Sequence, residues 1–452
     1  MSNLSPQISS HYSIFFSFVI YSVVVEVKKI IMENKLRIWS ISRFCVKQIF
    51  VRSNYNHSHF RNKQYQLKNG LVSTKFLTNP NSFTTNTRFT STTTNSQKKL
   101  IDLRSDTITK PTNEMLHCAL TARTGDDVFN EDPTVLELQE YAANLFGKEA
   151  GLYLPTTTMS NLCAISAHCH ERASEIIIGF NSHIAIYEGG NVSNMAGVST
   201  RQLMENKDAT LPFDQIRDVT HLDNDDHYAK TQLVCVENTH NCLGGVALSK
   251  SYVDELSKLA QSLSLKLHVD GARIFNSAIS QNLSVKDLNQ GADSVSICLS
   301  KGLGAPLGSL IVGDSEFIRL AKRARKRCGG GMRQAGVVAS MGLYAIKNHV
   351  DRLKQDHIRA KRLASELHRN GFLIPRDGIV DTNLVFFALP ENSLISKDEL
   401  PTKLQEEYGV QITGGYSEGK KFFRAAMHLN VNDEDVDFAA EALTTICLGK
   451  RS

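Results

Sequence analysis

Short apolar segments alternate with segments of helical spacing through the middle of this chain, and this alternation restricts the possible folds more than any other feature. The apolar segments have the length and composition of buried strands. They lie at 151–154, 176–178, 233–236, 265–269, 295–299 and 310–312. Because strands that alternate with helices form a parallel sheet with helices on both faces, we predict an α/β fold with a large, mostly parallel sheet.

Signals for helix starts stand between these strands. Asp132 followed by Pro133 is an N-cap residue with proline at the first helical position, and apolar residues at helical spacing come next. Ser251 and Asp254 have the spacing of a capping box. Helical spacing also covers residues 317–327 and, with dense charges, about 343–369.

The chain is predicted to consist of three parts. Residues 1–98 are a leader without a fold, 99–345 form the large domain, and 346–452 form a smaller C-terminal α/β domain with strands at 383–389 and 422–429. The end of the leader, 79–99, is polar and rich in threonine, which is typical of a linker.

The leader carries the basic character of the chain. Residues 1–100 contain 14 Lys and Arg but two acids, and the other 352 residues contain 37 basic and 44 acidic side chains. The apolar run 14–25 is too short to span a bilayer, and the basic, Ser- and Asn-rich stretch after Met32 suits a mitochondrial transit peptide. We therefore expect no membrane anchor and a mitochondrial or cytoplasmic location, with the leader favouring the former. An unstructured extension or an unused upstream start is the alternative.

Composition also narrows the partners. Nine cysteines without regular spacing argue against a disulfide framework. The basic run 322–327 is best interpreted as the solvated face of an amphipathic helix, because the body of the chain is acidic. We expect no nucleic-acid partner.

Three polar segments follow predicted strands, at 155–158, 270–273 and 300–304. Ligands of open parallel sheets collect at the carboxyl ends of the strands. Lys301 follows an apolar strand, where its charge is costly unless it is used or removed. Buried lysines serve as Schiff-base nucleophiles, and a lysine that reaches solvent is the alternative.

Asp270 ends the strand His268-Val269-Asp270. A carboxylate that faces a pyridinium nitrogen keeps the nitrogen protonated and makes the ring an electron sink. A helix N-cap is one alternative. A metal pair with His268 is another, but no third ligand has informative spacing, and we predict no metal.

Thr156, Thr157 and Thr158 lie between a predicted strand and a predicted helix. Hydroxyl and amide groups at a helix N-terminus suit a phosphate. Threonines also commonly cap helices, so this signal is weak by itself.

Six sequence blocks together resemble the signatures of the low-specificity L-threonine aldolases. They are DLRSDT at 102–107, GDD at 125–127, ENTHN at 237–241, HVDGAR at 268–273, LSKGLG at 299–304 and GGGMRQ at 329–334. The blocks occur in the family's order, and the resemblance covers about residues 100–445. It implies the aspartate-aminotransferase-like fold of type I pyridoxal-phosphate enzymes, with the cofactor in the large domain.

The resemblance also implies an activity, namely retro-aldol cleavage of L-threonine or L-allo-threonine to glycine and acetaldehyde. Such a carbon–carbon lyase belongs to amino-acid catabolism and glycine biosynthesis. It further implies a homo-oligomer, a tetramer or at least a dimer, and the choice between these two stays open. Which of the two threonine diastereomers is preferred stays open.

Roles of individual residues at the cofactor follow from the same resemblance. Lys301 would form the Schiff base, Asp270 would pair with the pyridine nitrogen, and His183 would stack on the ring. Thr157 and Thr158 would hold the phosphate. The family commonly has glycine where Thr157 stands, and a backbone N–H donor there tolerates threonine as long as φ stays negative.

Other residues would contact the substrate or complete the site. Arg273, which also borders the cofactor, would grip the substrate carboxylate with Arg424 and Ser105. A guanidinium fork suits a carboxylate. His227 and Tyr187 would line the region around the substrate hydroxyl.

Lys326 and Arg333 would approach the cofactor phosphate from a neighbouring subunit. The base that removes the hydroxyl proton is open between His183, His227 and a bound water. The alternatives to the aldolase are another lyase of the same fold, such as an aromatic amino-acid β-eliminating lyase, an aminotransferase, or a non-catalytic cofactor-binding homologue.

Overall fold

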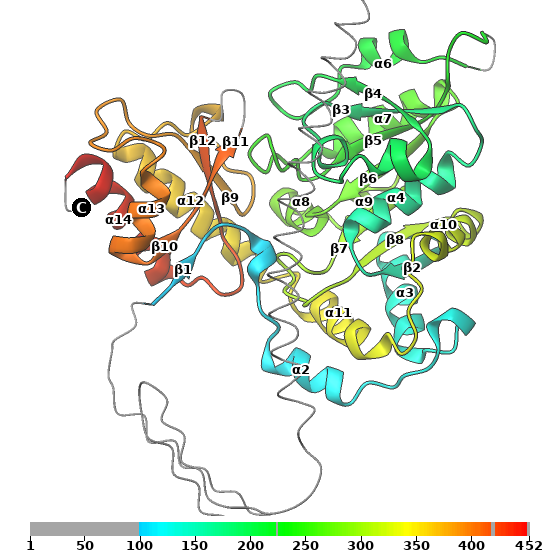
Figure 1. Cartoon of the computed structure of the whole chain (residues 1–452), viewed down its shortest axis with the longest axis horizontal. Helices are drawn as coiled ribbons and strands as arrows, with labels where there is room; N and C mark the ends of the chain where they lie inside the picture. Colours follow the sequence, from blue (N-terminus) through cyan, green and yellow to red (C-terminus); the bar gives the residue numbers. More distant parts are fainter. Residues whose placement is uncertain (1–98, 223–224, 417–420, 450–452) are drawn as a thin grey trace, which may run out of the picture. The chain divides into compact units, whose positions relative to one another are not determined.

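A seven-stranded sheet forms the centre of the larger part of the protein (Figure 1). The computed structural model describes residues 99–222, 225–416 and 421–449. The strand order is β2 (Ala150–Leu154), β8 (Ser309–Gly313), β7 (Ser294–Cys298), β6 (Lys266–Gly271), β5 (Lys230–Glu237), β3 (Ser174–Gly179) and β4 (Ser199–Leu203). Neighbouring strands are parallel except at β8, which pairs antiparallel with β2 and with β7. The predicted α/β fold with a mostly parallel sheet is confirmed.

Helices cover both faces of this sheet, as Figure 1 shows. One face packs against α4 (Thr157–His168) and α10 (Ser315–Arg327), which share an apolar cluster with β2 and β8. The other face packs in the main core against α3 (Pro133–Phe146), α7 (Lys250–Ser262), α8 (Ile274–Gln281), α9 (Val285–Leu288) and α11 (Gly336–Asn348). The consecutive residues Ile176, Ile177 and Ile178 point alternately into different clusters, as the two-residue period of a strand requires.

A second apolar core lies in the C-terminal part. An antiparallel sheet has the order β11 (Thr413–Tyr416), β12 (Phe422–Ala426), β9 (Leu384–Phe387), and β1 (Ile101–Asp102) pairs parallel with β10 (Val410–Gln411). Strands β1, β9, β10 and β12 pack with α12 (Leu353–Arg369) and α14 (Asp433–Leu448). The N-terminal strand β1 therefore packs in the C-terminal core, and the proposed domain boundary at 345/346 stays a prediction.

The remaining helices are short. They are α2 (Asn113–Leu120), α5 (His183–Ile186), α6 (Phe213–Val219) and α13 (Leu400–Lys403), with single turns at Asp106–Ile108, Asp127–Phe129, Val192–Ala196, Arg376–Gly378 and Leu404–Tyr408. No helix within the described ranges is long and apolar enough to cross a bilayer. The predicted leader 1–98 lies outside the described residues.

Two local predictions were wrong in detail. The N-cap of α7 is Ser249, whose side chain accepts from the backbone N–H of Tyr252, and Ser251 instead contacts the Ser249 hydroxyl. The helical spacing over 343–369 belongs to two helices, α11 and α12, which are separated at 349–352.

The start of α3 agrees with the prediction and involves more than a cap. Asp132 Oδ1 accepts from the backbone N–H groups of Thr134 and Val135, each at 3.1 Å. Its Oδ2 accepts from Gly125 N at 3.2 Å and Gly336 N at 2.8 Å. One buried carboxylate thus joins α3 to the preceding loop and to the start of α11.

We predict that Asp132→Ala lowers the free energy of unfolding by about 3 kcal/mol, because it removes a cap and leaves buried N–H groups without an acceptor. Urea denaturation followed by circular dichroism measures this loss. Asp314→Ala is the control, since this exposed N-cap of α10 accepts only from Phe317 N among the described residues and its loss costs about 1 kcal/mol. Equal losses in the two variants would contradict the role of Asp132.

Candidate active site

Acidic and basic side chains meet where β5, β6 and β7 end. Glu237 at the end of β5 pairs in register with Asp270 of β6, and Asp270 pairs with Ser296 of β7. Lys301 follows β7 by three residues and is half-buried. The polar strand ends predicted from the sequence therefore do share one edge of the sheet.

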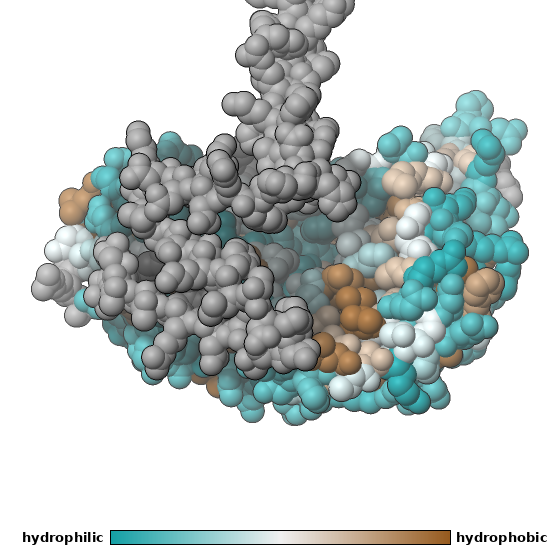
Figure 2. Space-filling view, turned by 60° about the horizontal axis from the view of Figure 1, so that its bottom comes forward, coloured by the Kyte–Doolittle hydropathy of each residue, from teal (hydrophilic) through white to brown (hydrophobic). Residues whose placement is uncertain are grey.

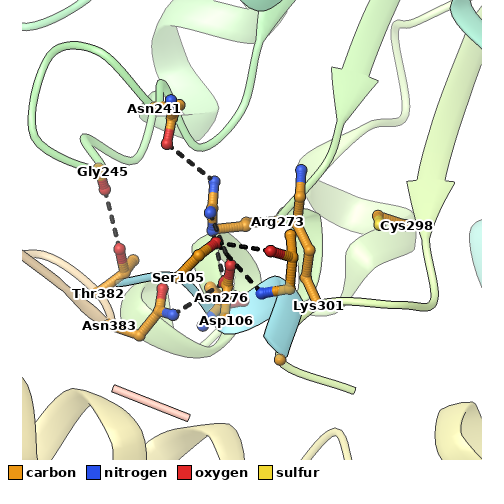
Figure 3. A network of polar contacts seen from close by, with 12 residues as sticks. Ser105, Asp106, Asn241, Gly245, Arg273, Asn276, Cys298, Lys301, Thr382 and Asn383 are labelled. Atoms are coloured by element: carbon orange, nitrogen blue, oxygen red, sulfur yellow. Dashed lines mark hydrogen bonds and ion pairs between the residues drawn. The ribbon is translucent and has the colours of Figure 1, made fainter. Parts of the chain in front are cut away.

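A buried ion pair lies beside Lys301 (Figure 3). Arg273 Nε and Nη2 donate to the two carboxylate oxygens of Asp106 at 2.7 and 2.8 Å, and Asn383 Nδ2 donates to Asp106 Oδ2 at 3.0 Å. Burial alone would raise the pKa of Asp106, but the charge and hydrogen bonds of Arg273 hold that pKa well below its usual range. The fork of Arg273 is therefore occupied, and its Nη1 lies 3.4 Å from Asn241 Oδ1.

A second buried arginine contacts the same asparagine. Arg424 Nη1 donates to Asn241 Oδ1 at 2.7 Å, and Nη2 donates to the backbone oxygen of Arg104 at 2.9 Å. Its Nε has no hydrogen-bond partner among the described residues, and its guanidinium lies 4.6 Å from the ring of Tyr416. Burial, and then the charge of Arg273, lower the pKa of Arg424. Two cations that share one acceptor make this place favourable for an anion.

His183 lies among carboxylates at the same edge. Its Nδ1 lies 3.0 Å from Glu188 Oε1, and its backbone N–H donates to Glu237 Oε2 at 2.7 Å. Burial alone would lower the pKa of His183, but the hydrogen bond to Glu188 and the charges of Asp270 and Glu237 raise it. Burial raises the pKa of Glu188. Both directions favour one proton held between the imidazole and Glu188.

The Glu237 side chain joins two segments of the site. Its Oε2 accepts from His183 N, and its Oε1 accepts from Asn241 N at 2.9 Å. The turn that carries His183 and the loop that carries Asn241 are thus held by one buried carboxylate.

The three threonines 156–158 lie between strand β2 and helix α4, as predicted. Thr156 caps α4 by accepting from Met159 N at 3.2 Å, and Thr157 is the first helical residue. The Thr157 hydroxyl is buried and has no partner within the described part of the chain. Because Thr157 adopts helical backbone angles, its side chain causes no strain of the kind that would favour glycine.

Tyr187 and Ser105 border these groups. The ring of Tyr187 lies 5.6 Å from that of His183, and its hydroxyl lies 3.8 Å from Cys242 Sγ. Ser105 follows Arg104, whose carbonyl binds Arg424, and the Ser105 hydroxyl accepts from Thr107 N at 3.2 Å.

Other predicted residues are not brought into this cluster. The side chain of His227 is 90% exposed and contacts Asp225 at 2.8 Å. Lys326 is exposed on α10, and Arg333, 58% exposed, pairs with Asp126 at 2.8 Å. Their proposed roles stay predictions.

Several residues of the cluster were missed by the sequence reasoning. Asp106, Glu237 and Asn241 lie inside the recognised blocks but had received no role. Asn161 and Glu188 lie outside the blocks. A buried asparagine in the apolar helix 160–167 was the available signal, because an unpaired polar group there is costly.

Comparison with known proteins gives consistent matches. The model of the beta-eliminating lyase family matches residues 102–390. Low-specificity L-threonine aldolase 1 of Arabidopsis thaliana is 39% identical over 339 residues, which are 75% of this chain and 94% of that protein. The low specificity L-threonine aldolase of Escherichia coli K12 is 43% identical over 300 residues, or 66% of this chain and 88% of that protein.

Solved structures share the fold. The threonine aldolase of Leishmania major superposes with a TM-score of 0.66 at 17% identity, over 76% of this chain and 99% of that one. The 4-hydroxyphenylacetaldehyde synthase of Rhodiola rosea superposes with a TM-score of 0.62 at 18% identity, over 76% and 82%. At such identities the likeness concerns the fold alone.

We predict that Asp106→Asn lowers the free energy of unfolding by about 3–5 kcal/mol at pH 7, because Arg273 is left as an unpaired buried charge. The pKa of Asp106 is lowered in the folded state, so its contribution is present above the ordinary value of about 4 and is lost as the pH falls further. Urea denaturation from pH 7 to pH 3 measures the gap between the wild type and the variant. The gap should narrow below about pH 4, and a constant gap would contradict the assignment.

Proposed function

Because this chain belongs to the beta-eliminating lyase family and, within it, to the low-specificity L-threonine aldolases, we propose that it cleaves L-threonine and L-allo-threonine to glycine and acetaldehyde. The reaction depends on pyridoxal 5'-phosphate. The observation that carries the proposal is that Asp270 and Lys301 lie at the carboxyl edge of the large sheet with His183 beside Asp270, in a chain of this family. Arg424 of β12 reaches the same place through Asn241, in the loop after β5.

The residues present fit this cofactor. The buried Thr157 hydroxyl, unpartnered among the described residues, lies at the start of α4, where helix N–H groups also suit a phosphate. Thr157 and Thr158 would hold the phosphate, Asp270 the pyridine nitrogen and Lys301 the aldehyde carbon. When bound, the cofactor supplies an electron sink for the bond that breaks next to the amino group.

The substrate carboxylate would be held chiefly by Arg424. Its Nε has no partner among the described residues, whereas the fork of Arg273 is filled by Asp106. Arg273 would contribute its remaining Nη1 and its charge, and Ser105 its hydroxyl. This refines the role expected for Arg273, which would mainly orient Asn241 and hold the ion pair.

His183 is the favoured holder of the hydroxyl proton. Its Nδ1 is engaged by Glu188, which leaves Nε2 for the substrate or a bound water. His227 stays a candidate, although its side chain is 90% exposed within this single chain.

We propose that the protein is a homo-oligomer, a tetramer or at least a dimer. Leu116 and Leu120 are 46% and 85% exposed on α2. This helix lies low in Figure 1, on the side that comes forward in Figure 2. A neighbouring copy would cover such leucines. The Lys326 and Arg333 side chains of one copy would then approach the cofactor phosphate of the other. We also propose a mitochondrial or cytoplasmic location, on the composition of the leader.

We predict that Lys301→Ala abolishes the visible absorbance of the bound cofactor and reduces turnover of threonine by at least about 10³-fold, since the covalent attachment is lost. Absorbance spectra and an assay of glycine plus acetaldehyde measure both effects. Lys347→Ala removes a surface lysine that pairs with Glu137 and should leave both unchanged. Wild-type protein that yields pyruvate and ammonia, or a keto acid, would contradict the aldolase and favour the related lyase or aminotransferase.

We predict that Arg424→Lys raises KM for threonine by about 10–100-fold, because a lysine cannot reproduce the fork on a carboxylate. Steady-state kinetics at saturating cofactor measure the change. Arg362→Lys is the matched control, since this arginine of α12 is half-exposed and pairs with Asp437. An unchanged KM in the Arg424 variant would place the carboxylate elsewhere.

A further inference from the structure

Asn161, a fully buried residue of α4, connects two carboxylates of the site. Its Nδ2 donates to Asp270 Oδ2 and to Glu188 Oε1, each at 2.9 Å. A side-chain amide nitrogen carries two hydrogens, so each carboxylate receives one. Asn161 Oδ1 accepts from Ser296 Oγ at 2.8 Å, and the orientation of the amide is thereby determined on both sides.

A chain of buried hydrogen bonds continues from Asn161 away from the site. His268 Nε2 lies 3.3 Å from Asn161 Oδ1, and His268 Nδ1 lies 2.8 Å from Ser294 Oγ. The same Ser294 oxygen lies 2.8 Å from Nε2 of His168, at the far end of α4. Three side chains therefore follow Asn161 in a row.

The donor-to-acceptor direction of these hydrogen bonds follows from the protonation states of the two histidines. Burial, opposed by the charge of Asp270, lowers the pKa of His268 to about 4. Burial, with a smaller effect of His268, lowers the pKa of His168 to about 3. Both imidazoles are therefore neutral at pH 7, and each carries one N–H.

One assignment of the hydrogens satisfies all of these side-chain contacts. His268 Nε2 faces the acceptor Asn161 Oδ1, so it carries the hydrogen and Nδ1 accepts from the Ser294 hydroxyl. The Ser294 oxygen in turn accepts from His168 Nε2–H. Every N–H or O–H of the chain thus points towards Asn161, whose own N–H groups point at Asp270 and Glu188.

We propose that Asn161 is a positioning residue and that the chain from His168 through Ser294 and His268 directs its aligned dipoles, through Asn161, at Asp270. Dipoles in a row polarise one another where the dielectric constant is low. These dipoles stabilise the negative charge of the Asp270 carboxylate, which would hold the protonated ring nitrogen of the cofactor. The proposal rests on the proposed function because it assumes that Asp270 faces this ring. The second N–H of Asn161 couples this support to Glu188 and so to His183.

A metal ion is the alternative ligand for the cluster of His183, Glu188 and Asp270. One ligand atom each of His183, Glu188 and Asp270 lie within 4.8 Å of one another. The Asn161 nitrogen already donates to Glu188 Oε1 and Asp270 Oδ2, and a donor N–H directed at the same oxygens competes with a metal ion. The hydrogen bonds therefore favour positioning of the carboxylates over metal binding.

The test uses full-length holoenzyme loaded with pyridoxal phosphate that carries ¹⁵N in its ring. Asn161→Ala removes a hydrogen bond that stabilises the carboxylate anion of Asp270, so the ¹⁵N chemical shift of the ring should move towards that of a neutral pyridine. The dissociation constant of the cofactor should rise by about tenfold or more, since charge-assisted hydrogen bonds are lost. Ser294→Ala, which breaks the chain farther from Asp270, should change both in the same direction but less.

Two further variants separate the possible results. Asn289→Ala is the matched control, because Asn289 is also a fully buried asparagine and its amide donates to the Val285 carbonyl. It should lower stability without changing the ¹⁵N shift. Asp270→Asn should change the ¹⁵N shift most. If Asp270→Asn leaves the shift unchanged, the proposed contact between Asp270 and the cofactor ring is wrong, and the failure lies in the proposed function.

The proposal is overturned if Asp270→Asn changes the ¹⁵N shift while folded Asn161→Ala and Ser294→Ala proteins keep the wild-type shift and cofactor affinity. Thermal unfolding and circular dichroism show which variants are folded. If Asn161→Ala does not fold, Ser294→Ala decides by the same criterion. Added Zn²⁺ or Mn²⁺ that binds the wild-type holoenzyme at Glu188 and Asp270, and is lost on Glu188→Gln, would also overturn it.

Discussion

The buried ion pair of Asp106 and Arg273 is the interaction on which the arrangement of the site depends. Its partners come from distant segments, a turn after β1 and the N-cap position of α8. Asn383, just before β9, donates to the same carboxylate. Two buried charges lose their hydration, and this loss is offset only when their geometry is good and their other hydrogen bonds are made. The pair therefore requires these three segments to meet in one geometry, beside Lys301.

The consequences extend to the groups that remain available. Because Asp106 fills the fork of Arg273 and Asn241 bridges both arginines, Arg424 keeps a free Nε within the described part of the chain. The buried Thr157 hydroxyl likewise has no hydrogen-bond partner among the described residues. Under the proposed function, these two atoms would face the substrate carboxylate and the cofactor phosphate. The fold is shared with a 4-hydroxyphenylacetaldehyde synthase, and a fold by itself does not specify a reaction.

Local patterns predicted the elements well and their ends less well. The six strands and the start of α3 at Asp132 could be read because burial on two faces and capping are local properties. The start of α7 could not, since two serines two residues apart are both good caps. In the structure Ser249 accepts from the backbone N–H of Tyr252, whose hydroxyl accepts from the distant Leu211 N at 2.8 Å. At the break between α11 and α12, His349 Nδ1 contacts the distant Leu303 carbonyl at 2.8 Å.

The sequence by itself determined the fold class, the family and the ordered blocks that contain Lys301, Asp270 and Arg273. Strand periodicity and motif spacing depend on residues close together in the sequence, so they can be recognised without the tertiary structure. Only the tertiary structure decided that Asn161 bridges Asp270 and Glu188, and that Asp106 occupies Arg273. These partners lie 109, 27 and 167 positions apart in the sequence. Hydrogen bonds need heavy atoms within about 3 Å, and no spacing along a chain specifies which distant atoms the packed sheet brings that close.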